Sequence, residues 1–210
     1  MSGEGGKRMA ADFRKQMGPF ITARREPKVV RLPALKYVMI AGRGDPAKGK
    51  EFQEAVQALY TLVYTLKFSS KPGSRQRQMP VLPLDALWWM PGRKGFPANA
   101  PRSAWRWQAM LAVPGFVTEA MLAKVRKEVL SKKPMPLVRK VRLKTWKEGL
   151  CAQVLHVGPY SAERPTIKRL HDFIKAQGYR PTGRHHEIYL SDPRRTSPRN
   201  LKTILRQPMV

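Results

Sequence analysis

A glutamate within a strand-like pattern is the first residue of this sequence whose type and setting favour chemistry. Glu187 lies in the segment HHEIYLSD (185–192), which reads as an interior strand. The period of two places Glu187 and Tyr189 on one face of this strand and Ile188 on the other. A carboxylate beside aromatic rings can act as a general base, hold a water molecule or pair with a cationic ligand. A solvent-exposed glutamate, or one paired with a nearby arginine, would give the same pattern without any chemistry.

Two tyrosines offer hydroxyl groups from one side of a helix. The segment from about 50 to 67 has apolar residues at helical spacing, and Tyr60 and Tyr64 lie four residues apart within it. Their phenol groups can donate hydrogen bonds to a carbonyl oxygen. Packing in the core is the alternative, and it is the commoner fate of helical tyrosines beside leucines.

Tryptophans are concentrated in two neighbouring strand patterns, 81–90 and 103–113. Trp88 and its neighbour Trp89 must point to opposite faces, whereas Trp105 and Trp107 share a face. Indole rings present wide, flat surfaces that suit a planar heteroaromatic ligand. A tryptophan-rich core would have the same pattern.

The sequence gives no sign of a metal or cofactor site. Cys151 is the single cysteine, which excludes an intramolecular disulfide and a zinc site built from cysteines. The four histidines lack ligand spacing, and no phosphate-binding loop, dinucleotide fingerprint or nucleophile elbow is present. We therefore expect no cofactor and no metal. The absence of a long apolar run or an apolar leader predicts a cytoplasmic protein without membrane association.

Charge is the most unusual feature of the composition. Lysine and arginine number 41 against 14 acidic residues, a formal net charge of +27 that is spread along the chain. Such a balance predicts attraction to polyanions, above all non-specific association with nucleic acid, although a solubilising surface would account for it equally well. No zinc finger, basic zipper or helix-turn-helix pattern accompanies the charge.

The elements that must position these residues occur twice in the same order. Residues 1–27 lack a sustained period and read as a flexible basic extension, too short for a folded DNA-binding module. A strand at 29–44, a helix at 50–67 and two strands follow, and the order strand, helix, strand, strand returns after residue 133. We expect an α+β domain over 28–210, with halves at about 28–115 and 133–208 joined by a connector helix at 116–132. Two such halves predict a pseudo-two-fold antiparallel sheet with helices on one face and a central ligand groove on the open face.

Several motifs in order resemble the GyrI-like small-molecule-binding domain family over roughly 28–208. The carboxyl-terminal third carries an HxGPY turn at 156–160, HEIYLSDPRR at 186–195 and LKTILRQP at 201–208. The upstream matches are KYVMIAGRGDP (36–46), LYTLVY (59–64), VLPLDALWW (81–89) and PGFVTEAMLAKV (114–125). The resemblance implies the duplicated β-α-β-β (SHS2-like) fold and an aromatic pocket that contains an acidic residue.

The chain is most similar to a stand-alone branch of that family, which hydrolyses the cyclopropane of DNA-alkylating cyclopropylpyrroloindole natural products and so protects cells. This similarity implies that Glu187 activates the attacking water and that Tyr60 or Tyr64 stabilises the developing phenolate. It also implies that Trp88 and Trp107 hold the flat ring system.

Further members of the ligand site follow from the same pattern. Tyr189 shares the face of Glu187, and Tyr160 follows the Gly-Pro turn, where either a structural role or a place at the end of the groove is expected. The alternatives to hydrolysis are a non-catalytic binder or sensor of flat aromatic or cationic molecules, and a gyrase-associated or DNA-associated inhibitor.

Overall fold

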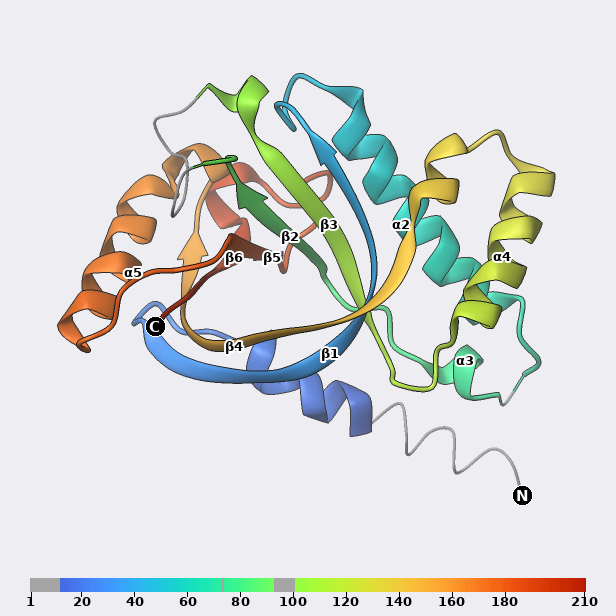
Figure 1. Cartoon of the computed structure of the whole chain (residues 1–210), viewed down its shortest axis with the longest axis horizontal. Helices are drawn as coiled ribbons and strands as arrows, with labels where there is room; N and C mark the ends of the chain where they lie inside the picture. The colour runs from blue at the N-terminus through green and yellow to red at the C-terminus, as the bar shows by residue number, and fades with distance from the viewer. Residues whose placement is uncertain (1–11, 73, 93–100) are drawn as a thin grey trace.

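Six antiparallel strands form a closed barrel in the computed structural model, which describes residues 12–72, 74–92 and 101–210 (Figure 1). The strands are β1 (Lys28–Arg43), β2 (Leu84–Trp89), β3 (Arg106–Val113), β4 (Arg142–Val157), β5 (His185–Tyr189) and β6 (Lys202–Pro208). Their order in the barrel is β1-β3-β2-β5-β6-β4, and β4 pairs with β1 to close it. The α+β class predicted from the sequence is thus confirmed.

The closure of the sheet corrects the expectation of an open face between two halves. Strands β1 and β4 are each 16 residues long, and they pair from Lys28–Gln153 to Met39–Arg142. The ladder skips Pro33, which has no N–H to donate, and Gly149 opposite Leu32 has a φ of +81°. Proline and glycine at this point bend the two long strands, so that they meet and close the barrel.

The helices cover the outside of the barrel in two groups (Figure 1). Helices α2 (Lys50–Phe68) and α4 (Glu119–Lys132) lie beside one half, and α5 (Arg164–Ala176) lies beside the other, while the short α3 (Arg75–Gln78) follows α2. Thr118 caps α4, because its hydroxyl accepts a hydrogen bond from the Met121 amide at 3.3 Å. None of the described helices is long and apolar enough to cross a membrane.

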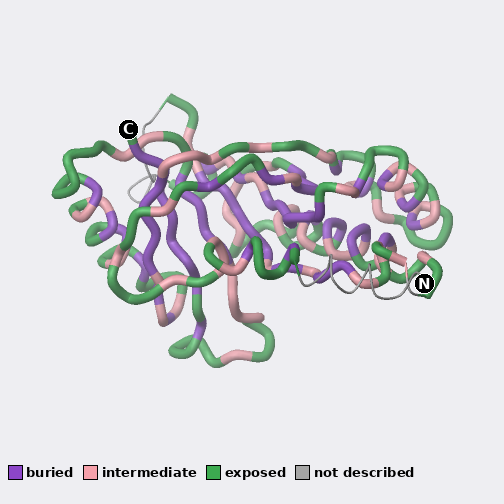
Figure 2. Tube along the Cα trace, turned by 90° about the horizontal axis from the view of Figure 1, so that it is seen from below, coloured by how far each residue is buried: buried purple, intermediate pink, exposed green. Residues whose placement is uncertain are grey.

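Buried side chains lie on both faces of the sheet, and most strand segments contain stretches of buried residues, which are purple in Figure 2. One apolar cluster lies between the sheet and helices α2 and α4, and a second lies between the sheet and α5. A third cluster, which includes Leu35, Tyr37 and Met110, occupies the inner face of the barrel. The inner face therefore needs apolar residues as much as the outer face does.

The amino-terminal segment is packed into the fold, which corrects the expectation of a flexible extension for residues 12–27. Phe13 and Met17 lie one turn apart in a helical segment over 12–17, and they are 8% and 2% exposed within the inner cluster. Backbone carbonyls further along accept hydrogen bonds from the barrel: Thr22 from the Gln153 side chain at 3.0 Å and Arg24 from the Leu155 amide at 2.7 Å. Residues 1–11 lie outside the described part of the chain.

Charged side chains are also buried on the inner face, close to this segment. Glu148 accepts from His186 Nδ1 at 3.0 Å and from Arg206 Nη1 at 3.3 Å, and His186 Nε2 lies 3.6 Å from Asp85 Oδ2. Arg206 also donates to the carbonyl of Phe20. Burial alone would raise the pKa of Glu148, but His186 and Arg206 together outweigh it and hold that pKa below its ordinary value. The network thus ties the amino-terminal segment to β4, β5 and β6.

Candidate functional site

Glu187 lies on the outer face of the sheet, between the two groups of helices. Its neighbours across β5 are Ala86 on β2, which packs in the α2 and α4 cluster, and Leu205 on β6, which packs in the α5 cluster. An open sheet with helices on one face and Glu187 in a groove on the other would require the Ile188 face to pack on helices. Instead Ile188 points into the barrel and is 1% exposed, because a closed sheet has a second apolar side of its own.

A chain of hydrogen bonds fixes Glu187 in place. Tyr189 donates to Glu187 Oε2 at 2.7 Å, and Trp88 Nε1 donates to the Tyr189 hydroxyl at 3.1 Å. His185 is fully buried, with Nε2 at 3.5 Å from Glu187 Oε1. Burial and the negative charge of Glu187 raise the pKa of Tyr189 well above its ordinary value. Tyr189 therefore stays a hydrogen-bond donor. Three predicted site residues, Trp88, Tyr189 and Glu187, thus form one chain of hydrogen bonds.

A second buried carboxyl group, Glu163, lies near Glu187 and was not singled out by the sequence analysis. It immediately precedes α5 and is 5% exposed, and its Oε1 accepts no hydrogen bond within the described residues. Burial and the charge of Glu187 raise the pKa of Glu163 far above its ordinary value, against smaller opposing effects of Thr203 and Arg102. Glu163 therefore holds its proton at neutral pH, close to the carboxyl group of Glu187.

Tyr160 covers this pair of carboxyl groups. It begins the short turn Tyr160–Ala162 between β4 and α5, and its ring meets Tyr189 edge to face, with centroids 5.6 Å apart. Burial, Glu163 and Glu187 raise the pKa of Tyr160 to about 12. The side chain is nevertheless 38% exposed. Tyr160 therefore separates the buried carboxyl groups from solvent, and we name Glu163, Glu187, Tyr160, Tyr189 and Trp88 the carboxyl cluster.

The two helical tyrosines have different surroundings. Tyr60 is half-buried against the α2 cluster and hydrogen-bonds the backbone of Leu84, the residue of β2 that pairs with Tyr189. Burial, Tyr64 and Asp85 raise the pKa of Tyr60 to about 12. Tyr64 is 45% exposed and packs beside Tyr60 and Phe68, one helical turn away on either side. The structure places Tyr60 at the edge of the carboxyl cluster and Tyr64 outside it.

Trp107 is a core residue behind the cluster. It is 1% exposed, and its ring meets Phe52 edge to face at 5.1 Å. Phe52 also packs against Trp88, with ring centroids 5.2 Å apart. Trp107 also pairs with Trp88 across β2 and β3, so it supports the cluster from the core both directly and through Phe52.

The described residues contain no group of three acidic, histidine or cysteine side chains that could hold a metal ion. What the carboxyl cluster offers chemically is a pair of neighbouring buried carboxyl groups, one of which, Glu163, holds a proton at neutral pH. Pairs of this kind supply an acid and a base in one site.

The family model described as the GyrI-like small molecule binding domain matches residues 109–208, which include β5, β6 and all of α5. A crystal structure of an uncharacterized conserved protein from Listeria innocua is 40% identical, with a TM-score of 0.85, and the match covers 94% of this chain and 98% of that one. The chain belongs to the GyrI-like small-molecule-binding domain family.

A second GyrI-like relative is described as a hydrolase from Listeria innocua. It is 37% identical, with a TM-score of 0.81, over 94% of this chain and 98% of the relative. The C-terminal domain of EcmrR is 12% identical, with a TM-score of 0.55 over 88% of this chain and 97% of that domain, and this likeness shows the fold alone. No curated protein matches this GyrI-like chain.

Proposed function

We propose that this protein is a hydrolase that adds water to the strained cyclopropane of DNA-alkylating cyclopropylpyrroloindole-type compounds, and so protects the cell. The observation that carries the proposal is the pair of buried carboxyl groups, Glu163 and Glu187, beneath aromatic rings, with the proton of Glu163 held by its surroundings. The resemblance to the stand-alone branch supports it, as do relatives named hydrolases at 37% and 38% identity.

Glu187 acts as the base in this reaction. Its carboxylate takes a proton from water as the water oxygen bonds to the cyclopropane methylene carbon. The carbon–carbon bond that breaks sends its electron pair through the ring system to the dienone oxygen, which becomes a phenolate. The hydrogen bond from Tyr189 holds Glu187 Oε2, and His185 Nε2 lies 3.5 Å from Oε1, the oxygen that takes the proton from water.

Glu163 acts as the acid. Its carboxyl proton passes to the phenolate oxygen as negative charge develops there, so the product has gained one water molecule. The proton on Glu187 then returns to Glu163 through solvent, which restores both groups. The unpartnered Oε1 of Glu163 is the polar atom that the substrate oxygen or a water molecule would satisfy.

Aromatic side chains provide the surface for the flat substrate. Trp88 and Tyr189 are fixed by their mutual hydrogen bond, and Tyr60 supplies a further phenol at the edge of the cluster. Tyr160 must rotate away for a ligand to reach the carboxyl groups, because it packs on Tyr189 in the present structure. Trp107 supports this surface through Phe52.

We also propose that the two halves are copies of one β-α-β-β (SHS2-like) module, as the repeated order of elements indicates.

The test is to incubate the protein with a cyclopropylpyrroloindole compound and follow product mass and product formation at substoichiometric protein. We expect a mass gain of one water for the wild type and a loss of turnover, at least about 100-fold, in Glu187→Gln, since general-base catalysis contributes about that much. Glu54→Gln, an exposed glutamate on α2, is the matched control and keeps full activity.

Two results would contradict the proposal. Turnover by Glu187→Gln at the wild-type rate would exclude Glu187 as the base. A compound that co-elutes with the protein unchanged would identify a sequestering protein, whose aromatic cluster binds but does not catalyse.

A further inference from the structure

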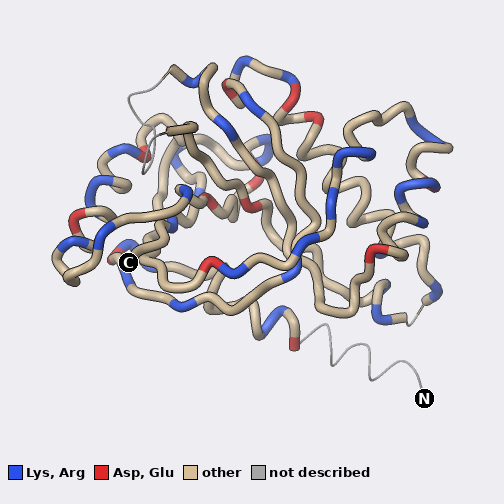
Figure 3. The backbone as a smooth tube through the Cα atoms, in the orientation of Figure 1, with Lys and Arg blue, Asp and Glu red and all other residues tan. Residues whose placement is uncertain are grey.

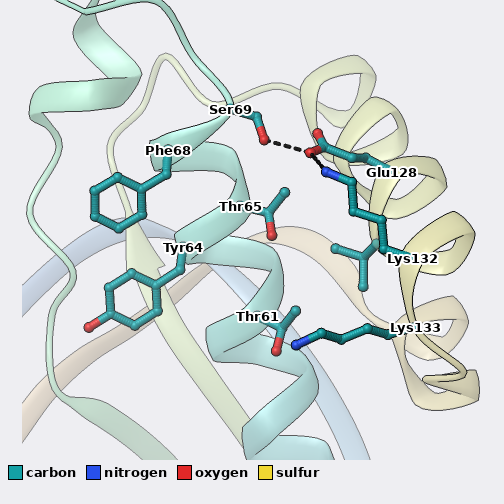
Figure 4. Close-up of a pocket in the computed structure, with 9 residues that line it drawn as sticks. Thr61, Tyr64, Thr65, Phe68, Ser69, Glu128, Lys132 and Lys133 are labelled. Atoms are coloured by element: carbon teal, nitrogen blue, oxygen red, sulfur yellow. Dashed lines mark hydrogen bonds and ion pairs between the residues drawn. The ribbon is translucent and has the colours of Figure 1, made fainter.

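Two aromatic rings are exposed side by side on the outer surface of α2. Tyr64 is 45% exposed and Phe68 is 51% exposed. Their ring planes differ by 4° and their centroids lie 6.0 Å apart. Figure 4 shows both rings face-on, one beside the other, on the same side of the helix. Together they form a flat aromatic platform that contains no residue of the carboxyl cluster.

The platform is one wall of a shallow trough that α2 forms with α4. The trough has a volume of about 350 Å³ and is lined by Thr61 and Thr65 between the rings and the lysines Lys132 and Lys133 of the opposite wall (Figure 4). Aromatic faces, hydroxyl groups and ammonium groups thus face one surface hollow.

Positive charge dominates the surroundings of the trough. The acidic side chain in its lining, Glu128, already accepts from Ser69 at 2.8 Å and from Lys132 at 2.6 Å. At the other wall the Arg77 guanidinium lies 4.6 Å from the centre of the Phe68 ring and donates to the Phe68 carbonyl at 3.0 Å. Lys133 in the lining of the trough and Arg77 over one face of the Phe68 ring thus place two cations near the platform.

We propose that this trough binds single-stranded nucleic acid, with bases stacked on Tyr64 and Phe68 and phosphates held by the flanking lysines and arginine. Aromatic platforms within a basic groove bind single strands of any sequence, because every base has a π-face to stack. The net charge of +27 draws a polyanion to the surface and opposes a second copy of the chain as the occupant. The proposal is independent of the hydrolase activity, since it uses none of the residues of the carboxyl cluster.

Fluorescence anisotropy with a labelled 12-nucleotide oligo-dT tests this inference. An abasic strand of the same length and a 12-base-pair duplex serve as companions, because they carry phosphates but present no free base faces. We expect the wild type to bind oligo-dT at least about tenfold more tightly than the abasic strand, since stacking contributes about 1–3 kcal/mol per base. The double variant Tyr64→Ala/Phe68→Ala loses that difference.

Matched variants separate stacking from diffuse charge. Tyr64→Phe keeps the ring and keeps binding, and Tyr179→Ala removes a tyrosine that is 40% exposed elsewhere and changes nothing. Both altered platform residues lie on the surface, so unchanged circular dichroism is expected for every variant. Equal binding of oligo-dT by the wild type and the double variant would overturn the proposal. The proposal would also be overturned if the wild type bound the abasic strand or the duplex as tightly as it binds oligo-dT. Binding of mononucleotides but not of strands would overturn it as well.

Discussion

At the scale of single residues, the protonation of the buried Glu163 carboxyl group makes the free energy of unfolding depend on pH. The pKa of Glu163 is raised in the folded protein, so the folded state holds this proton more tightly than the unfolded chain does. Stability from this group is fully present below the unfolded pKa of about 4.5 and falls as the pH rises toward the folded pKa.

Glu163→Gln removes this penalty without removing the side-chain volume. Each unit of pKa shift corresponds to about 1.4 kcal/mol, and about 1 kcal/mol moves the Tm of a protein of this size by about 2–4 °C. We expect Glu163→Gln to melt several degrees higher than the wild type at pH 8 and to converge with it near pH 4. Thermal melts from pH 4 to pH 8 check this, with Glu54→Gln as the control. A variant that follows the wild-type curve at every pH would show that Glu163 is ionised in the folded state.

A tightly packed glycine gives a second prediction. A methyl group added at Gly42 would lie 2.2 Å from the Trp107 ring, which is itself 1% exposed. Overpacking of this kind destabilises by about 1–3 kcal/mol or more, so we expect Gly42→Ala to lower the urea midpoint markedly. The matched change Gly115→Ala, where no atom lies within 4 Å of an added methyl group, leaves it unchanged. A stable Gly42→Ala would mean that Trp107 moves freely.

Strand periodicity predicted part of the candidate site, whereas the rest depends on tertiary contacts that no local pattern reveals. The alternation over HHEIYLSD predicted that Glu187 and Tyr189 share a face, and their hydrogen bond of 2.7 Å agrees. Glu163 is 24 residues earlier in the chain, in another element, so no local pattern relates it to Glu187. Its position after the Gly-Pro-Tyr turn, in a chain with few acids, was the available signal.

At the scale of elements, the amino-terminal segment supplies part of the inner core. Met17 is 2% exposed within that core, and truncating a buried methionine to alanine destabilises by about 2–5 kcal/mol. Met17→Ala is therefore expected to shift the urea unfolding transition strongly, whereas Lys15→Ala, on the exposed side of the same segment, is expected to leave it in place. Equal midpoints for the two variants would indicate that the segment does not contribute to stability.

The elements themselves followed from the sequence, but their closure did not. Apolar spacing in α2 and α5, and the cap at Thr118, depend on residues close together in the chain. The pairing of β1 with β4 depends on residues more than a hundred positions apart, such as Val29 and Ala152. Two apolar faces on one strand are compatible with either an open or a closed sheet, so periodicity alone could not choose between them.

At the scale of the whole molecule, the high net positive charge lowers the stability of the folded state. Figure 3 shows lysine and arginine at positions spread along the described chain and acidic residues at fewer positions. Repulsion among these charges destabilises the folded state, and salt screens it, with a Debye length of about 10 Å at 0.1 M. We expect the Tm to rise by several degrees between about 20 mM and 300 mM salt. Scans with NaCl and KCl check this together, and a Tm that falls or stays constant would contradict it.

The closed sheet affects how copies of this chain can associate with one another. Each of the six described strands has a partner on both sides, so the finished barrel has no unpaired edge to which another chain could add a strand. Before β4 is synthesised, however, β1 lacks one of its two partner strands and has an unpaired edge. At that stage the nascent chains already carry many lysines and arginines, and we expect their mutual repulsion to oppose pairing between unfinished sheets. The charge that weakens the finished fold is thus expected to limit aggregation while the fold forms.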